Sequence, residues 1–143
     1  VGTALVPDDL DRSLEAGARF AVSPGTTERL VERAGAVGLP LLPGVSTASE
    51  VMRARDLGLR ALKFFPAESV GGAKMLQRMG PVFPDVRFCP TGGITLANAP
   101  EYLALPSVSC VGGSWVVPRA LLDMGDFSAI GKLAAETVAA LRG

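Results

Sequence analysis

Lys63 is the residue of this sequence best suited to covalent chemistry. It alone among the three lysines lies within an apolar run, Ala61–Phe65, whereas Lys74 and Lys132 fall in amphipathic segments. A free lysine has a pKa of about 10.4, so only about one amine in 2,500 is uncharged at pH 7. Burial beside apolar groups lowers that pKa and creates a nucleophile that can form an imine with a carbonyl compound. The alternative is a lysine that extends to solvent or pairs with a carboxylate such as Glu68.

Two double-glycine turns, Gly92–Gly93 and Gly112–Gly113, follow later apolar runs, and the second continues into Ser114. Backbone amides without side chains can approach an oxyanion closely, so the pair of turns predicts a phosphate site. The alternative is that the glycines only permit tight turns. Thr91 precedes the first turn and is predicted to hydrogen-bond a substrate carboxylate or hydroxyl, unless it caps the next helix.

The composition excludes several classes of function. The 143 residues include 14 acidic and 14 basic residues and no histidine. Balanced charge argues against binding to nucleic acid or to a membrane surface, and no apolar run reaches the roughly 20 residues of a membrane span. The lack of histidine rules out catalytic triads, and two cysteines, Cys89 and Cys110, cannot form a zinc site. Both are expected to be buried, reduced thiols of a cytoplasmic protein.

Short apolar runs and longer amphipathic segments must position these side chains. Six runs are predicted as buried strands: Val1–Val6, Phe20–Ser23, Leu39–Leu42, Ala61–Phe65, Val86–Cys89 and Val108–Val111. Six segments are predicted as helices: Asp8–Ala18, Thr26–Val37, Thr47–Leu57, Gly72–Met79, Thr95–Leu103 and Pro118–Leu141.

Helix-end signals support these segments. The run Ser46–Glu50 resembles a capping box at the start of a helix. Gly17, Gly35 and Gly58 are placed where helices are expected to end.

Apolar strands that alternate with helices predict an α/β fold with a parallel sheet, and the active site is then expected at the carboxyl ends of the strands. Either a (β/α)8 barrel or an open doubly wound sheet fits the pattern. Barrels often bind phosphate after strands 7 and 8. If the glycine pairs are those loops, the visible strands are numbers 3 to 8. We therefore expect one domain over residues 1–143 that is part of a longer barrel, lacking its first two βα units.

Together these residues resemble the family of 2-keto-3-deoxy-6-phosphogluconate (KDPG) and 4-hydroxy-2-oxoglutarate (KHG) aldolases. The similarity covers essentially the whole chain, and its two most specific segments are Lys63–Glu68 and Arg87–Ile94. Four further segments match in order: Val1–Thr3, Phe20–Gly25, Leu41–Thr47 and Val111–Trp115. The resemblance favours the barrel over the open sheet.

The resemblance implies a class I aldolase that cleaves a phosphorylated 2-keto sugar acid reversibly to pyruvate and an aldehyde, with no metal or other cofactor. Lys63 would form the imine, and Thr91 would contact the pyruvate portion. Thr3, Pro24 and Phe65 would line the substrate site, and the distal phosphate would bind to Gly92, Gly93, Gly113 and Ser114.

The resemblance also implies a homotrimer. The family's catalytic glutamate and carboxylate-binding arginine lie in the early strands, and no residue here matches them. We therefore expect the chain to be poorly active or inactive by itself. Two alternatives stay open: a phosphogalactonate-specific aldolase of the same family, and an inactive, truncated barrel that binds phosphosugars.

Overall fold

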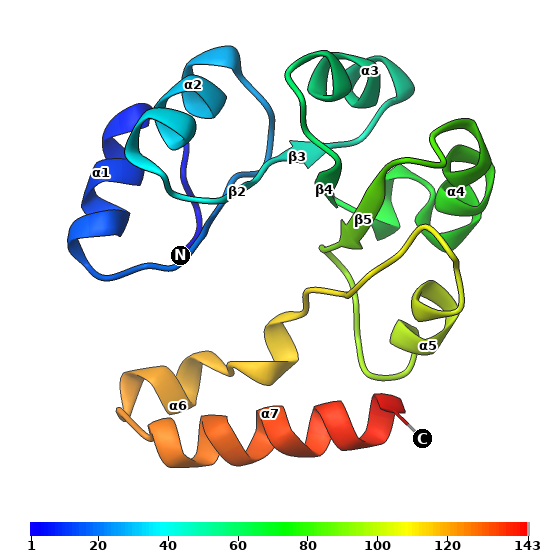
Figure 1. The fold of residues 1–143 in the computed structure, drawn as a ribbon. Helices are drawn as coiled ribbons and strands as arrows, with labels where there is room; N and C mark the ends of the chain where they lie inside the picture. Colours follow the sequence, from blue (N-terminus) through cyan, green and yellow to red (C-terminus); the bar gives the residue numbers. More distant parts are fainter. Residues whose placement is uncertain (143) are drawn as a thin grey trace.

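The computed structural model describes residues 1–142, in which strands and helices alternate along the chain (Figure 1). The strands are β1 (Ala21–Val22), β2 (Leu41–Leu42), β3 (Gly44–Val45), β4 (Ala61–Phe64) and β5 (Arg87–Pro90). The helices are α1 (Pro7–Glu15), α2 (Glu28–Val37), α3 (Ala48–Asp56), α4 (Gly72–Met79), α5 (Ala99–Leu103), α6 (Arg119–Asp123) and α7 (Phe127–Arg142). Three single 3-10 turns cover Glu68–Val70, Gly80–Val82 and Ser114–Val116. Every strand pair is parallel, which confirms the predicted α/β class.

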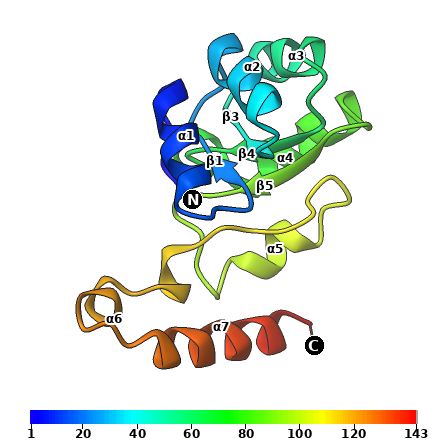
Figure 2. The same cartoon turned by 60° about the vertical axis from the view of Figure 1, so that its left-hand side comes forward.

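The strands form one curved wall in chain order. β1 pairs with β2, and β3, β4 and β5 pair in sequence. A hydrogen bond of 2.8 Å from Lys63 N to the Pro43 carbonyl connects the chain between β2 and β3 to β4. Figures 1 and 2 show α1 to α5 outside this wall, with α6 and α7 beyond α5.

The predicted outermost strands, Val1–Val6 and Val108–Val111, are wrong as continuous strands. Gly2 forms only an isolated bridge to Val22, and Val108 forms one to Phe88. Each segment pairs along one side only within the described residues, so it lacks the second neighbour that holds an inner strand extended.

The predicted start of α3 is confirmed. Thr47 Oγ1 accepts a hydrogen bond from Glu50 N at 3.3 Å, and the Glu50 carboxylate accepts from the Thr47 backbone at 2.8 Å. Gly17 and Gly58 follow α1 and α3 with φ of 78° and 81°, as predicted. The prediction for Gly35 is wrong, because α2 continues to Val37 and Gly38 provides the left-handed end at φ 68°.

Two predicted helices differ from the structure. The segment Pro118–Leu141 is broken at Gly125, which adopts a φ of 66° between α6 and α7. The segment Thr95–Leu103 is helical only from Ala99, because Asn98 Oδ1 accepts the Thr95 amide at 2.7 Å and forms a turn there instead.

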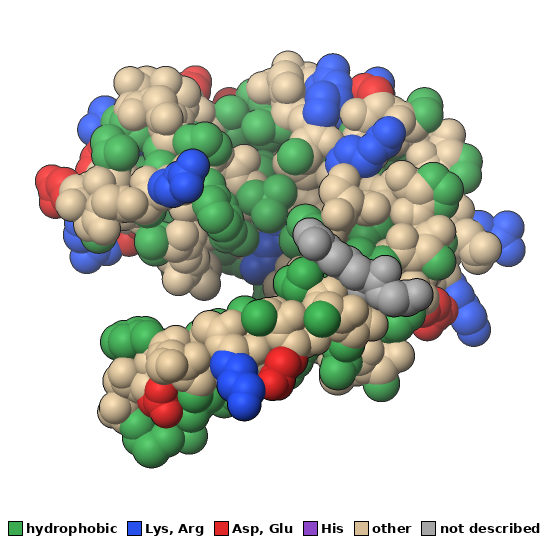
Figure 3. All heavy atoms as spheres, turned by 60° about the horizontal axis from the view of Figure 1, so that its bottom comes forward, with side chains coloured by type: hydrophobic (Ala, Val, Ile, Leu, Met, Phe, Trp, Pro, Cys, Tyr) green, Lys and Arg blue, Asp and Glu red, His purple; other side chains and the backbone are tan. Residues whose placement is uncertain are grey.

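The core consists of two clusters. The larger packs β3, β4 and β5 against α3, α4 and α5, and it includes an edge-to-face contact between Phe64 and Phe88 with ring centroids 6.4 Å apart. The smaller packs β1 against α1 and α2 through Ala4, Leu10, Ala21, Leu30, Ala34 and Leu39. Figure 3 shows hydrophobic side chains on the surface around α6 and α7, where Met124 and Phe127 are 70% and 71% exposed.

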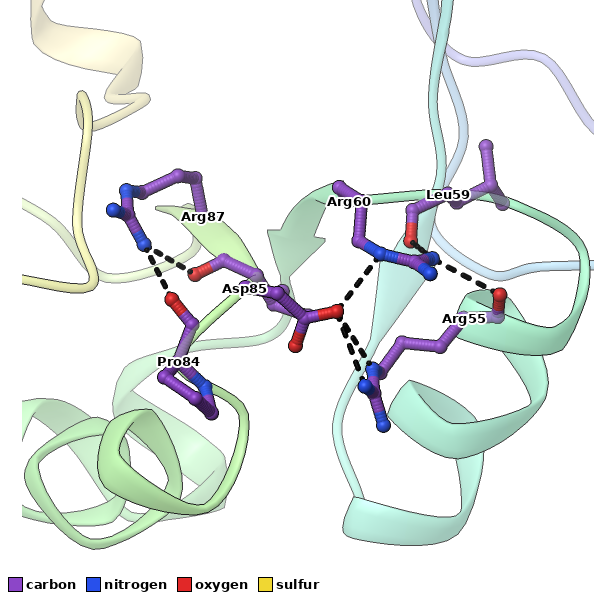
Figure 4. Close-up of polar contacts among 7 residues, drawn as sticks. Arg55, Leu59, Arg60, Pro84, Asp85 and Arg87 are labelled. Carbon is purple, nitrogen blue, oxygen red and sulfur yellow. Dashed lines mark hydrogen bonds and ion pairs between the residues drawn. The ribbon is translucent and has the colours of Figure 1, made fainter.

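A charged cluster lies at the amino ends of β4 and β5 (Figure 4). Asp85 Oδ2 accepts hydrogen bonds from Arg55 at 3.1 Å and pairs with Arg60 Nε at 2.9 Å. Arg87 donates to the Pro84 carbonyl at 3.0 Å. The cluster connects the end of α3 to the entry of both strands, at the opposite end of the wall from the carboxyl ends.

Candidate active site

Lys63 lies on the inner face of β4, in register with Gly44 of β3 and Cys89 of β5. Its neighbours Leu62 and Phe64 are fully buried on the outer face, as expected for side chains that alternate along a strand. Burial lowers the pKa of Lys63, and the nearby Cys89 thiol opposes that change. The half-buried amine is therefore closer to its nucleophilic form at neutral pH than an ordinary lysine.

Phe65 supplies the closest aromatic neighbour of this amine. The Nζ of Lys63 lies 4.4 Å from the centroid of the Phe65 ring. Lys63 forms no ion pair within the described part of the chain. Glu68 instead accepts a hydrogen bond from the Tyr102 hydroxyl. The alternative of a Lys63–Glu68 pair is therefore wrong.

Thr91 directly follows β5, beside the next segment of the wall. Its amide donates to the Phe64 carbonyl at 2.9 Å, and it bridges to Gly112. Thr91 Oγ1 lies 3.4 Å from the Cys89 carbonyl. Helix α5 begins eight positions later, behind Asn98, so the alternative that Thr91 caps the following helix is wrong.

The two glycine turns lie at the ends of neighbouring segments, because the Thr91–Gly112 bridge joins them. Gly92 and Gly93 have φ of 98° and 80°, a conformation that side chains disfavour. A Cβ on Gly112 would lie 2.8 Å from Thr91 Oγ1, and one on Gly113 would overlap the Trp115 ring. Glycine is thus required at these positions by backbone conformation and packing. The turns also leave backbone amides and the exposed Ser114 near one another.

Thr3 and Pro24 occupy the far part of the wall. Thr3 is exposed, between Gly2 and Ala4, which both contact Val22. Pro24 follows β1 and lies directly beside Gly44, with no room for a side chain there. β1 and the β2–β3 segment separate Thr3 from β4, so the structure does not bring Thr3 beside Lys63 within the wall.

The cysteines depart from the prediction that both are buried. Cys89 is half-buried beside Lys63, and Cys110 is exposed. A thiol hydrogen bond from Cys89 lowers the pKa of Cys110 to about 6, and the same bond raises the pKa of Cys89. Lys63, Cys89 and Cys110 thus form a row across adjacent segments. The sequence alone does not fix this register, because it comes from the Thr91–Gly112 bridge in the structure.

Within residues 1–142, no cluster of three or more His, Cys, Asp or Glu side chains offers a metal site. None of the helices in that range is long and apolar enough to cross a bilayer.

A family model described as KDPG and KHG aldolase matches residues 1–133. The KHG/KDPG aldolase of Escherichia coli K12 is 55% identical over 137 residues, which are 96% of this chain and 64% of that protein. The chain therefore spans just under two thirds of that relative's length.

Two solved structures share the fold. A KDPG aldolase from Legionella pneumophila, with pyruvate captured as a covalent carbinolamine, superposes with a TM-score of 0.85 at 46% identity, covering 92% of this chain and 64% of that one. The 2-keto-3-deoxy-6-phosphogluconate aldolase of Zymomonas mobilis, solved with 3-phosphoglycerate, gives 0.79 at 56% identity, covering 82% and 56%. Because the family model matches most of the chain, this protein, with its parallel α/β wall and a half-buried strand lysine, belongs to the KDPG and KHG aldolase family.

Proposed function

We propose that the protein is a class I aldolase in which Lys63 forms the imine. The observation that carries this proposal is the half-buried Lys63 amine, with its lowered pKa, at the carboxyl end of β4. The names of the relatives support it, since the Escherichia coli protein is a KHG/KDPG aldolase and the Legionella structure holds pyruvate as a carbinolamine.

The reaction proceeds through covalent steps at Lys63. The neutral amine adds to the keto carbon of 2-dehydro-3-deoxy-6-phosphogluconate, and loss of water from the carbinolamine gives a protonated imine. The bond between C3 and C4 then breaks as its electrons move into the imine, while the C4 hydroxyl gives up its proton. This releases glyceraldehyde 3-phosphate and leaves an enamine. Protonation of the enamine and hydrolysis of the imine release pyruvate and restore the amine.

The same steps convert 4-hydroxy-2-oxoglutarate to pyruvate and glyoxylate. Thr91 is assigned to the pyruvate portion of the substrate, because its backbone is held between β4 and the segment of Gly112. Phe65, Thr3 and Pro24 are assigned to the walls of the site. The distal phosphate is assigned to four residues of the paired turns: Gly92, Gly93, Gly113 and Ser114.

We infer that residues 1–143 form a single partial domain, strands 3 to 8 of a (β/α)8 barrel. The 64% coverage of the relatives and the curved order of the strands support this assignment. The proton-shuttling glutamate and the carboxylate-binding arginine would come from the first two βα units. The chain preceded by those two units is the full-length barrel. We propose that it is a cytoplasmic homotrimer.

The proposal is tested by trapping pyruvate on the full-length barrel with borohydride, followed by mass mapping of peptides. We expect one adduct, on Lys63, and none after Lys63→Arg. Lys74→Arg is the matched control, because Lys74 is exposed on α4 and should leave the adduct intact. An adduct absent from the wild type, or retained by Lys63→Arg, would overturn the assignment.

Retro-aldol assays test which substrate is cleaved and whether residues 1–143 are active without the first two βα units. We expect turnover of the phosphogluconate substrate by the full-length barrel and little by residues 1–143 alone. A solved structure described as native KDPGal is 25% identical to this chain, with a TM-score of 0.73. A preference for the phosphogalactonate epimer would assign the protein that substrate specificity, with the same imine chemistry. Phosphate-ester binding without any imine would favour the inactive barrel instead.

A further inference from the structure

Glu68 lies between the two loops that carry the proposed site. It follows β4 in the turn after Lys63, and its carboxylate accepts a hydrogen bond from the hydroxyl of Tyr102 on α5. Tyr102 is fully buried, whereas Glu68 is exposed. A residue of the β4 loop is thereby tied to the helix that follows the β5 loop.

Backbone contacts hold the same two loops together. The amide of Ala67 donates to the Thr91 carbonyl at 2.8 Å, and the amide of Glu68 donates to the Gly92 carbonyl at 3.1 Å. The Glu68 side chain lies against Gly93, where an added Cβ would be 2.5 Å from Glu68 Cγ. The Glu68 stem therefore covers the turn that is assigned to the phosphate.

The polar end of Glu68 points toward the start of α4. A Cβ on Gly72 would lie 3.3 Å from the Tyr102 hydroxyl oxygen and 3.5 Å from Glu68 Oε1. Burial and the adjoining Glu68 carboxylate raise the pKa of Tyr102, so its hydroxyl stays protonated and continues to donate. The carboxylate is thus engaged by a buried donor and is not directed at the Lys63 amine as an acid or base.

We propose that Glu68 and Tyr102 are a positioning pair, which holds the Thr91–Gly93 turn in the shape that binds the distal phosphate of the substrate. This inference rests on the proposed function for the identity of the ligand. Neither residue touches the reacting atoms, so their loss weakens binding of the phosphate end and leaves imine formation at Lys63 unchanged.

The test uses the full-length barrel and glycerol 3-phosphate as the probe. Trp115 is the sole tryptophan and lies against Gly113, so its fluorescence reports binding at the paired turns. Tyr102→Phe and Glu68→Ala should each raise the Kd about fivefold to tenfold, the scale expected for losing one hydrogen bond. Glu68→Gln keeps a hydrogen-bond acceptor and should raise the Kd by a smaller factor. Glu101→Gln is the control, because Glu101 is an exposed carboxylate beside Tyr102 on the same helix.

Kinetics and trapping separate positioning from folding. In the same variants, KM for the phosphorylated substrate should rise about fivefold to tenfold with kcat within about twofold. Borohydride trapping of pyruvate on Lys63 should match the wild type. Glu68→Ala is the variant least expected to disturb folding, because Glu68 lies at the surface.

The inference is overturned if the Kd and KM of Tyr102→Phe and Glu68→Ala stay within about twofold of the wild type. It is also overturned if pyruvate trapping falls in parallel with phosphate binding, or if the wild type does not bind the probe. A wild type that binds glycerol 3-phosphate but never traps pyruvate would refute the proposed aldolase and leave the positioning pair supported.

Discussion

The Nζ of Lys63 lies 4.4 Å from the centroid of the Phe65 ring, and the two residues are two positions apart along the chain. The ring does two opposed things. Its apolar bulk keeps water from the amine, which favours the neutral form, and its electron-rich face attracts the cation. Burial is the largest cause of the lowered pKa of Lys63, so we expect the shielding by Phe65 to outweigh the attraction of its ring for the cation.

Substitutions of Phe65 should separate these two effects. Phe65→Leu keeps apolar bulk and removes the aromatic face, so the pKa of Lys63 should fall further. Phe65→Ala admits water, so the pKa should rise toward that of a free lysine. Competitive labelling with acetic anhydride across a pH series, read by mass spectrometry at Lys63, measures both. Labelling of exposed Lys132 is the internal control. The same direction of change in both variants would contradict the prediction.

Gly44 should tolerate no side chain. A Cβ there would overlap the carbonyl group of Pro24, where β1 ends beside β3. Gly44→Ala is therefore expected to destabilise the fold by about 2–3 kcal/mol, as overpacking against backbone does. Gly25→Ala is the matched control, since nothing lies within 4 Å of its added Cβ. Urea unfolding of the two variants gives the comparison, and equal midpoints would count against it.

Two glycines of the α2 segment should respond in opposite directions. Gly35 lies inside the helix with open space around it, so Gly35→Ala should stabilise by about 0.5–1 kcal/mol. Gly38 ends the helix at a φ of 68°, so Gly38→Ala should cost about 1 kcal/mol. Thermal unfolding measures both, and a destabilised Gly35→Ala would show that the helix does not extend through this position.

Asp85 should stabilise the fold by an amount that depends on salt and pH. Burial opposes ionisation, but hydrogen bonds and charges from Arg55 and Arg60 outweigh it and lower the pKa of Asp85. Its contribution is therefore complete above the unfolded-state value of about 3.9 and is lost as pH falls through the folded-state pKa.

Asp85→Asn should accordingly lower Tm at pH 7 in low salt, with the difference shrinking in high salt and vanishing in strong acid. Asp56→Asn is the control, because Asp56 is exposed and forms no ion pair within the described residues. A pH-independent effect of Asp85→Asn would contradict this account. Pyruvate trapping should be unaffected, since the cluster lies at the amino ends of the strands.

Local patterns in the sequence predicted much of this geometry. The alternation in Ala61–Phe65 was enough to place Lys63 and Phe65 on one face, and Ser46–Glu50 was enough to predict the start of α3. The contact between Glu68 and Tyr102 was not predictable in that way. The two residues are 34 positions apart, and their contact depends on how α5 packs against the β4 loop.

The errors have local physical causes as well. Gly125 interrupts an otherwise helical pattern, and the pattern alone does not distinguish a tolerated glycine from one that turns to positive φ. Cys110 lies in an apolar run that is not covered on its inner side within the described residues, so its hydropathy overstated its burial.

The division of the core has a consequence for protein engineering. Buried residues up to Leu39 pack in one cluster with α1 and α2, and those from Val45 onward pack in the other. A recombination junction near Pro43 would therefore separate few side-chain contacts, and segments from different relatives could be joined there. Gly44 and Pro24 would have to be inherited unchanged, because their backbones meet across the seam. Chimeras built at this junction would exchange the first part of the wall while keeping Lys63, Thr91 and both glycine turns from a single parent.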